Sequence, residues 1–137
     1  MRHSFLIRYM LLALGATTAS VTTVAAEKTD IRYDGIPAGA YAVVAEVRAK
    51  PGKERELRQV TLPLVDKVRA EPHNIIYFLH EDRASPGHFI FYEIFATKED
   101  FDAHNNTLHV QAWFARLPEL AEGNVKVTHM HLRGNTP

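Results

Sequence analysis

The middle of the chain reads His88-Phe-Ile-Phe-Tyr-Glu-Ile-Phe95, followed directly by Ala96-Thr-Lys-Glu-Asp-Phe-Asp-Ala-His104. The first eight residues are dominated by aromatic and β-branched side chains, which is typical of a strand buried on both faces. One carboxylate, Glu93, lies inside this run. Thr97 is a plausible helix N-cap, with Asp100 in the capping-box position three residues later. The stretch therefore predicts a strand carrying a buried acid, joined by a short turn to a helix that ends near a histidine.

Apolar periodicity on either side of this stretch predicts three further strands and two further helical segments. The strands are expected over residues 41–48, 74–82 and 125–132, and the helices over 53–70, bent at Pro63, and 110–117, with another turn from Pro118. The order β-α-β-β-α-β is that of a ferredoxin-like fold. We therefore predict an α+β domain in which helices cover one face of a four-stranded antiparallel sheet.

The second and third predicted strands are apolar on both faces, so the face opposite the helices also needs a cover. The simplest cover is the same face of a second copy of the chain, which gives a closed, symmetric pair. We therefore predict a homodimer in which two sheets pack together.

Composition limits the kinds of protein that this chain can be. It has 137 residues, enough for one domain, with 16 basic and 16 acidic side chains and no cysteine. The balanced charge predicts no large basic face for nucleic acid. The absence of cysteine excludes disulfides, thiolate catalysis and metal sites with cysteine ligands.

The N-terminus has the features of a cleavable secretory signal. Arg2 and Arg8 precede a short apolar run over residues 9–16, and small residues lead up to Ala26, where signal peptidase is expected to cut. The apolar run is well below the ~20 residues that span a bilayer, which favours a cleaved signal over a membrane anchor. We expect a periplasmic or secreted protein without a membrane attachment after cleavage. The chain then divides into a signal peptide (1–26), an extended tether (27–40), a domain (41–133) and a tail (134–137).

Short motifs along the domain resemble the antibiotic biosynthesis monooxygenase family over about residues 41–132. They are Lys50-Pro-Gly-Lys53, Arg69-Ala-Glu-Pro72 before a strand with Tyr77, Glu93 with an aromatic residue two positions later, and Ala103-His104 with His109 five positions on. The resemblance implies a dimeric α/β barrel that oxygenates a quinol or another electron-rich phenol without metal or flavin. Haem-degrading enzymes and an isomerase of a phosphorylated sugar have a similar scaffold.

Glu93 and His104 are the catalytic candidates. If the face that carries Glu93 meets the helices, desolvation raises the pKa of its carboxyl and suits it to proton transfer; the alternative is a structural acid. The His104 ring is expected to approach Glu93, which would orient it as a base. The alternative is a histidine that caps the helix C-terminus, and the resemblance favours the catalytic role.

Four further residues are candidates for substrate binding: Tyr77, Phe95, His109 and Trp113. Tyr77 could offer its hydroxyl to a quinol oxygen, or it could be a core residue. Phe95 stands where the family usually has a tryptophan. His109 either shares the cleft or caps the next helical segment, and Trp113 either lines the pocket or belongs to the core.

The sequence leaves other functions open. His129 and His131 share one face of the last predicted strand and, with His80, form a weak metal-site candidate. A module that binds a small ligand without catalysis is favoured by the phenylalanine at position 95. A haem-degrading variant would use His104 or His109 as its iron ligand.

Overall fold

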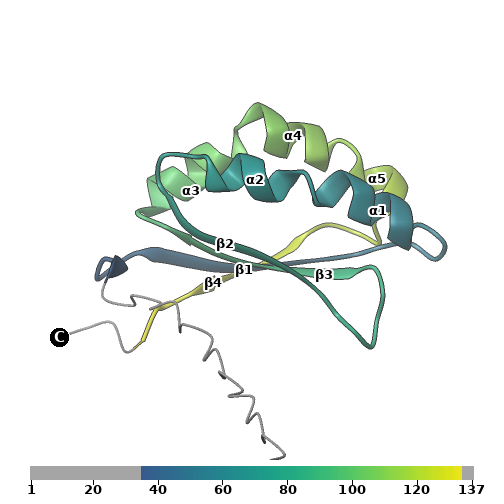
Figure 1. Cartoon of the computed structure of the whole chain (residues 1–137), viewed down its shortest axis with the longest axis horizontal. Helices are drawn as coiled ribbons and strands as arrows, with labels where there is room; N and C mark the ends of the chain where they lie inside the picture. Colours follow the sequence, from purple (N-terminus) through teal and green to yellow (C-terminus); the bar gives the residue numbers. More distant parts are fainter. Residues whose placement is uncertain (1–34, 134–137) are drawn as a thin grey trace, which may run out of the picture. The chain divides into compact units, whose positions relative to one another are not determined.

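Four strands form one antiparallel sheet, and the helices cover one of its faces (Figure 1). The structure, a computed structural model, describes residues 35–133. The strands are β1 (Tyr41–Arg48), β2 (Asn74–Glu81), β3 (His88–Phe95) and β4 (Lys126–Met130), and the helices are α1 (Glu54–Thr61), α2 (Leu64–Arg69), α3 (Lys98–Asn105), α4 (Leu108–Phe114) and α5 (Leu117–Leu120). The strand order is β2-β3-β1-β4. The predicted ferredoxin-like α+β fold is confirmed.

β3 lies inside the sheet, paired with β1 on one side and β2 on the other, which explains its apolar composition. Its side chains alternate between the two faces, so Glu93 and its neighbours of the same parity point toward the helices. In the register, Glu93 is opposite Val43 of β1 and Tyr77 of β2. The sequence prediction for the bounds of this strand is confirmed.

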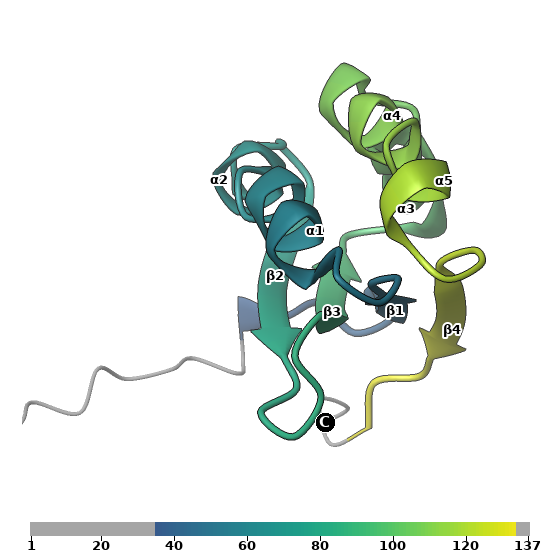
Figure 2. The ribbon, with the colours of Figure 1, turned by 90° about the vertical axis from the view of Figure 1, so that its right-hand side faces the viewer.

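The helix predicted over residues 53–70 is divided in two by Pro63. α1 ends at Thr61 and α2 begins at Leu64, because proline has no N–H to donate and its ring clashes with the preceding turn. The helices form two rows above the sheet, one of α1 and α2 and the other of α3, α4 and α5 (Figure 2). The space between these rows and the sheet contains the main apolar core.

The predicted cap of α3 is confirmed. The Asp100 N–H donates to Thr97 Oγ1 at 3.1 Å, and the Thr97 hydroxyl donates to Asp100 Oδ2 at 2.7 Å. These bonds hold the start of α3 directly after β3, so the sequence between Glu93 and His104 forms a tight strand–turn–helix unit. The buried acid and the histidine are thereby brought to the same region of the core.

The bounds of the last helices and of the last strand differ from the prediction. α4 begins at Leu108, two residues earlier than expected, and ends at Phe114, while β4 covers only five residues and is exposed along its whole length. β4 is short because it is an edge strand that pairs with β1 alone.

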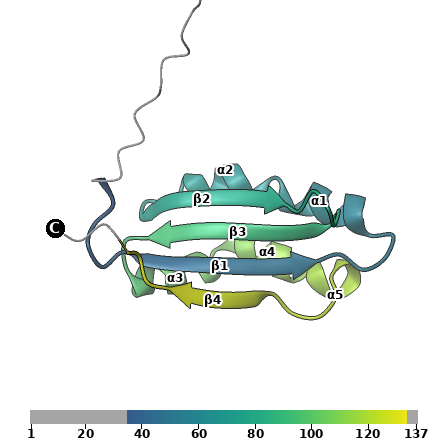
Figure 3. The ribbon, with the colours of Figure 1, turned by 90° about the horizontal axis from the view of Figure 1, so that it is seen from below.

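The face of the sheet opposite the helices is open in the described chain (Figure 3). One end of it is covered by the chain itself, since Ile36 and Leu132 pack against the buried residues Ala42 and Ile94. Elsewhere apolar side chains remain accessible, among them Met130 at 45%. This is the surface on which the predicted second copy would pack.

The predicted signal peptide (1–26), most of the tether and the tail (134–137) lie outside the described residues. Within residues 35–133, none of the helices combines the length and the apolar character that crossing a membrane requires.

Candidate active site

A small cavity lies between the helices and the sheet, and two ionisable side chains face it. Glu93 reaches it from β3 and His104 from the last turn of α3. Apolar and aromatic side chains form the rest of the wall, among them Tyr77, Phe91 and Trp113. Charged or polar groups in such surroundings lose the solvation that water would give them, so their proton affinities depend on the few partners that remain.

Glu93 is buried without a partner for one of its oxygens. The residue is 4% exposed, and Oε2 accepts no hydrogen bond from the described part of the chain. Burial, and secondarily the negative charge of Glu71, raise the pKa of Glu93 to about 8. Glu93 is therefore mainly protonated at neutral pH and can donate a proton inside the cavity.

His104 is buried and has two different environments at its two ring nitrogens. Nδ1 lies 3.0 Å from Glu71 Oε2, and Nε2 lies 3.9 Å from Glu93 Oε2. Because a carboxylate only accepts, Nδ1–H donates to Glu71, which leaves the lone pair of the neutral ring on Nε2. Burial lowers the pKa of His104, opposed in part by Glu71. The ring is thus held as a neutral base with its free nitrogen on the Glu93 side.

The orientation of His104 differs from the sequence prediction. We expected Glu93 to orient the ring, but the 3.9 Å separation is too long for a hydrogen bond, and the carboxylate that binds the ring is that of Glu71. Glu71 also binds His109, whose Nε2 lies 2.6 Å from Glu71 Oε1. One carboxylate therefore holds two imidazoles.

Sequence reasoning missed Glu71 because the residue lies just beyond the helix expected over 53–70 and directly precedes Pro72. Its place in the motif Arg69-Ala-Glu-Pro72 was the available signal. The contact with His104 spans 33 positions in the sequence, and the contact with His109 spans 38. Helical or strand periodicity does not reveal contacts between residues so far apart in the sequence.

The structure separates the four candidate substrate-binding residues into two pairs. Tyr77 and Trp113 line the cavity. Burial raises the pKa of the Tyr77 hydroxyl, and the Trp113 indole donates to Thr61 Oγ1 at 3.0 Å. Phe95 instead packs on the other side of His104, with ring centroids 4.9 Å apart, and His109 binds Glu71 outside the cavity. Phe95 and His109 therefore support His104 rather than line the cavity.

The cavity is about 30 Å³ in volume, room for about one water molecule. A much larger groove of about 600 Å³ adjoins it, between the α4–α5 segment and the chain that leads into β4. Phe114, Val125 and Val127 line both spaces and so form the boundary between them. An aromatic ring reaches Glu93 only if some of these side chains move.

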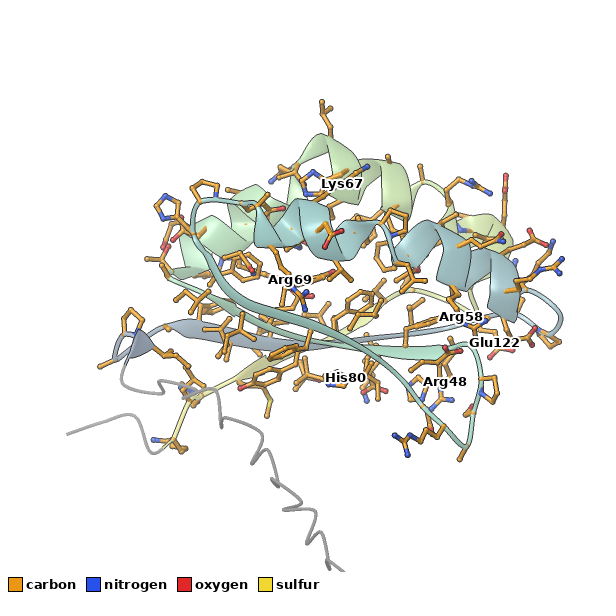
Figure 4. The ribbon with its side chains drawn as sticks, in the orientation of Figure 1. Arg48, Arg58, Lys67, Arg69, His80 and Glu122 are labelled. Atoms are coloured by element: carbon orange, nitrogen blue, oxygen red, sulfur yellow. The ribbon has the colours of Figure 1, made fainter. Side chains whose placement is uncertain are left out.

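The metal site suggested for His129 and His131, with His80 as a third ligand, is not supported. The register places His80 on the open face of the sheet and His129 on the helix face, so the two cannot bind one ion together. Figure 4 shows His80 below the sheet, away from the helices. His129 instead lies 2.8 Å from the Tyr41 hydroxyl. Within residues 35–133, no group of three His, Asp or Glu side chains is arranged to hold a metal ion.

Known proteins resemble this chain over most of its described residues. A profile of the family described as antibiotic biosynthesis monooxygenase matches residues 40–116, which include Tyr77, Glu93, His104 and Trp113. PA3566 from Pseudomonas aeruginosa is 26% identical with a TM-score of 0.67, covering 70% of this chain and 96% of that chain. A solved antibiotic biosynthesis monooxygenase is 27% identical with a TM-score of 0.64, covering 68% and 98%.

One curated protein also matches. The uncharacterized protein sll1783 from Synechocystis sp. is 26% identical over 78 residues, which is 57% of this chain and 53% of that protein. The chain thus spans about half the length of the curated relative that it matches.

Proposed function

Because this chain belongs to the antibiotic biosynthesis monooxygenase family, we propose that it is a monooxygenase that oxidises a quinol or another electron-rich phenol with dioxygen and without a cofactor. The family match supports the monooxygenase class, whereas the quinol substrate is part of the proposal. The observation that carries it is the free Nε2 of His104 facing the protonated carboxyl of Glu93 in an apolar cavity. A base and an acid stand side by side, shielded from water.

The proposed reaction begins when His104 Nε2 removes a phenolic proton. The substrate anion passes one electron to dioxygen, and the two radicals join through a new carbon–oxygen bond, which gives a peroxide. Loss of the proton on that carbon and cleavage of the oxygen–oxygen bond leave a carbonyl on the ring and release the outer oxygen as water. A quinol and one dioxygen thus give a hydroxyquinone and one water.

Each ionisable group has a distinct part in this scheme. His104 is the base, since its Nε2 carries a lone pair on the cavity side. Glu93 is the acid: its protonated carboxyl gives a proton to the peroxide, takes up the proton lost from the ring carbon and passes that proton to the leaving oxygen. His104 then returns the phenolic proton to Glu93, which restores both groups. Glu71 is a positioning residue that keeps the proton on Nδ1 of His104, and His109 holds Glu71 in place.

Two alternatives from the sequence lose support: the non-catalytic binding module and haem ligation by His109. A non-catalytic binding module was favoured by Phe95 in place of a pocket tryptophan, but Phe95 lies outside the cavity and the indole of Trp113 lines it. Iron ligation by His109 conflicts with the 2.6 Å contact of its Nε2 to Glu71. The oxygenase scheme therefore agrees best with the described geometry.

The decisive experiment is oxygen uptake by the purified mature protein, treated with chelator, across a panel of quinols and hydroxyanthrones. We expect uptake with at least one member, formation of a product containing one atom from dioxygen, and loss of uptake in the His104→Gln variant. Uptake that is equal in the variant would contradict the role of His104. No uptake across the panel would contradict the proposed substrate class.

We further propose that the open face of the sheet is covered by a second copy of the chain. Ile90 lies on this face, with Glu46 and His80 opposite it in the neighbouring strands. The Ile90→Lys variant should fold, since Ile90 is only half-buried in the single chain, but it places a further charge in the interface. We expect the dissociation constant to rise by on the order of 100-fold, measured as a change from dimer to monomer mass by light scattering.

The matched control is Leu108→Lys, which introduces the same side chain at a position of α4 that is 90% exposed. It should leave the mass unchanged. A wild-type protein that is monomeric at micromolar concentration, or an Ile90→Lys variant that stays dimeric, would contradict the proposed interface.

We also propose that the protein is exported, on the strength of the basic and apolar pattern before Ala26. Mass spectrometry of the protein from the extracytoplasmic fraction should show a chain that begins at Glu27. Full-length protein retained in the cytoplasm would contradict export.

A further inference from the structure

We propose that the groove next to the cavity binds an apolar extension of the substrate, so that the preferred substrate is a quinol carrying a long hydrocarbon side chain. This rests on the proposed function, because the quinol ring is taken to occupy the cavity.

The two spaces are neighbours of very different size. The cavity that contains Glu93 and His104 holds about 30 Å³, whereas the groove holds about 600 Å³, within the range of sites for whole small molecules. Phe114, Val125 and Val127 are common to both linings. If the ring displaces Phe114, which is only half-buried, the cavity and the groove become one elongated site.

The lining of the groove indicates the chemistry of its occupant. Most of the side chains are apolar: Phe114, Leu117, Pro118, Ala121, Val125 and Val127. In this part of the described chain the groove has one charged lining residue, Lys50, whose ammonium group donates to the Pro118 carbonyl at 2.7 Å. Hydrocarbon buried against these side chains gains hydrophobic free energy. A cationic extension would gain no carboxylate partner among them and would meet Lys50.

The groove is also separate from the surface assigned to the second copy. It lies between the α4–α5 segment and the strand β4, on the helix side, while the proposed dimer uses the opposite face of the sheet. Dimer formation through that face leaves the groove free for a ligand.

Binding can be followed without turnover, because Trp113 is the only tryptophan in the chain. Its ring lines the cavity and lies 5.3 Å from the ring of Phe114. Naphthoquinones, which are oxidised and do not react with dioxygen, should quench its fluorescence when they bind. The probes are a methyl-substituted parent and homologues with alkyl chains of increasing length.

The expected result is a dissociation constant that falls by up to about fourfold for each methylene that becomes buried, until the groove is filled. The Asn124→Phe variant adds a ring to the groove from an exposed position that does not line the cavity. It should remove the dependence on chain length and leave the affinity for the methyl parent unchanged. Glu122→Phe is the matched control, since Glu122, which is labelled in Figure 4, lines a different hollow. This variant should leave the whole series unchanged.

Three outcomes would overturn the inference. Equal affinities along the series would exclude the groove as a subsite and leave the proposed function standing. Equal effects of Asn124→Phe and Glu122→Phe on the long-chain probes would show that the chains bind elsewhere. Absence of quenching by every probe would contradict quinol binding itself, and with it both proposals.

Discussion

The His104→Gln variant is expected to lose quinol-dependent oxygen uptake by about 10²- to 10⁴-fold in kcat/KM, the usual contribution of a positioned general base. Glutamine fills a similar volume and can still approach Glu71, but it cannot accept a proton at neutral pH. The loss should appear mainly in kcat, since the ring of His104 forms only part of the cavity wall. Stopped-flow oxygen consumption and product analysis would measure it.

Two further variants separate catalysis from general damage. His131→Gln changes an exposed histidine and should behave as wild type. Glu71→Gln should lower kcat by a smaller factor and alter the pH profile, because the amide no longer holds the proton on Nδ1 of His104. A His104→Gln variant with undiminished kcat would move the base to another group, with Glu93 as the remaining candidate.

The Glu93→Gln variant is expected to change the pH dependence of stability more than any other single substitution in the cavity. The pKa of Glu93 is about 8 in the folded protein and close to 4.5 in the unfolded chain. Between these two values the unfolded chain is ionised and the folded protein holds its proton, so stability falls as pH rises through this window. Above about pH 8 both states are ionised and the loss is complete. Below about pH 4.5 both are protonated and the loss is absent.

Glutamine does not titrate, so the variant lacks this loss. Its free energy of unfolding should increase relative to wild type by on the order of 4 kcal/mol between pH 4.5 and pH 8. Urea unfolding at several pH values, followed by circular dichroism, would measure the difference. Glu99→Gln, on the first turn of α3, is the control and should show no comparable trend. A constant difference across the window would mean that Glu93 is not a buried, protonated acid.

Both expected effects depend on Glu93 and His104. The sequence identified these two residues, but it did not predict the contacts that each of them makes. Glu93 and His104 were identified as candidates because one is an acid inside an apolar strand, the other ends the helix that follows, and the family resemblance favours a catalytic role. The contact between these two side chains was predicted less well. The sequence suggested a direct Glu–His pair, whereas the structure has a 3.9 Å gap on one side of the ring and a hydrogen bond to Glu71 on the other.

The candidate binding residues illustrate the same limit. Tyr77 was a candidate only for its hydroxyl, and the structure places it in the cavity wall. Phe95 has the same parity as Glu93, yet it does not line the cavity, and its ring packs against that of His104 instead. Periodicity gives the face on which a residue lies but not its distance from a neighbour on that face.

The local pattern of residues was sufficient for the strands, the break at Pro63, the cap at Thr97 and the ferredoxin-like order, because each depends on the properties of neighbouring residues. Three other features arose only when the chain was folded. The carboxylate that orients His104, the small volume of the cavity and the groove beside it are formed by segments distant in sequence. Their geometry depends on how α2, α3, α4 and β4 pack together, and short-range sequence patterns carry no information about such packing.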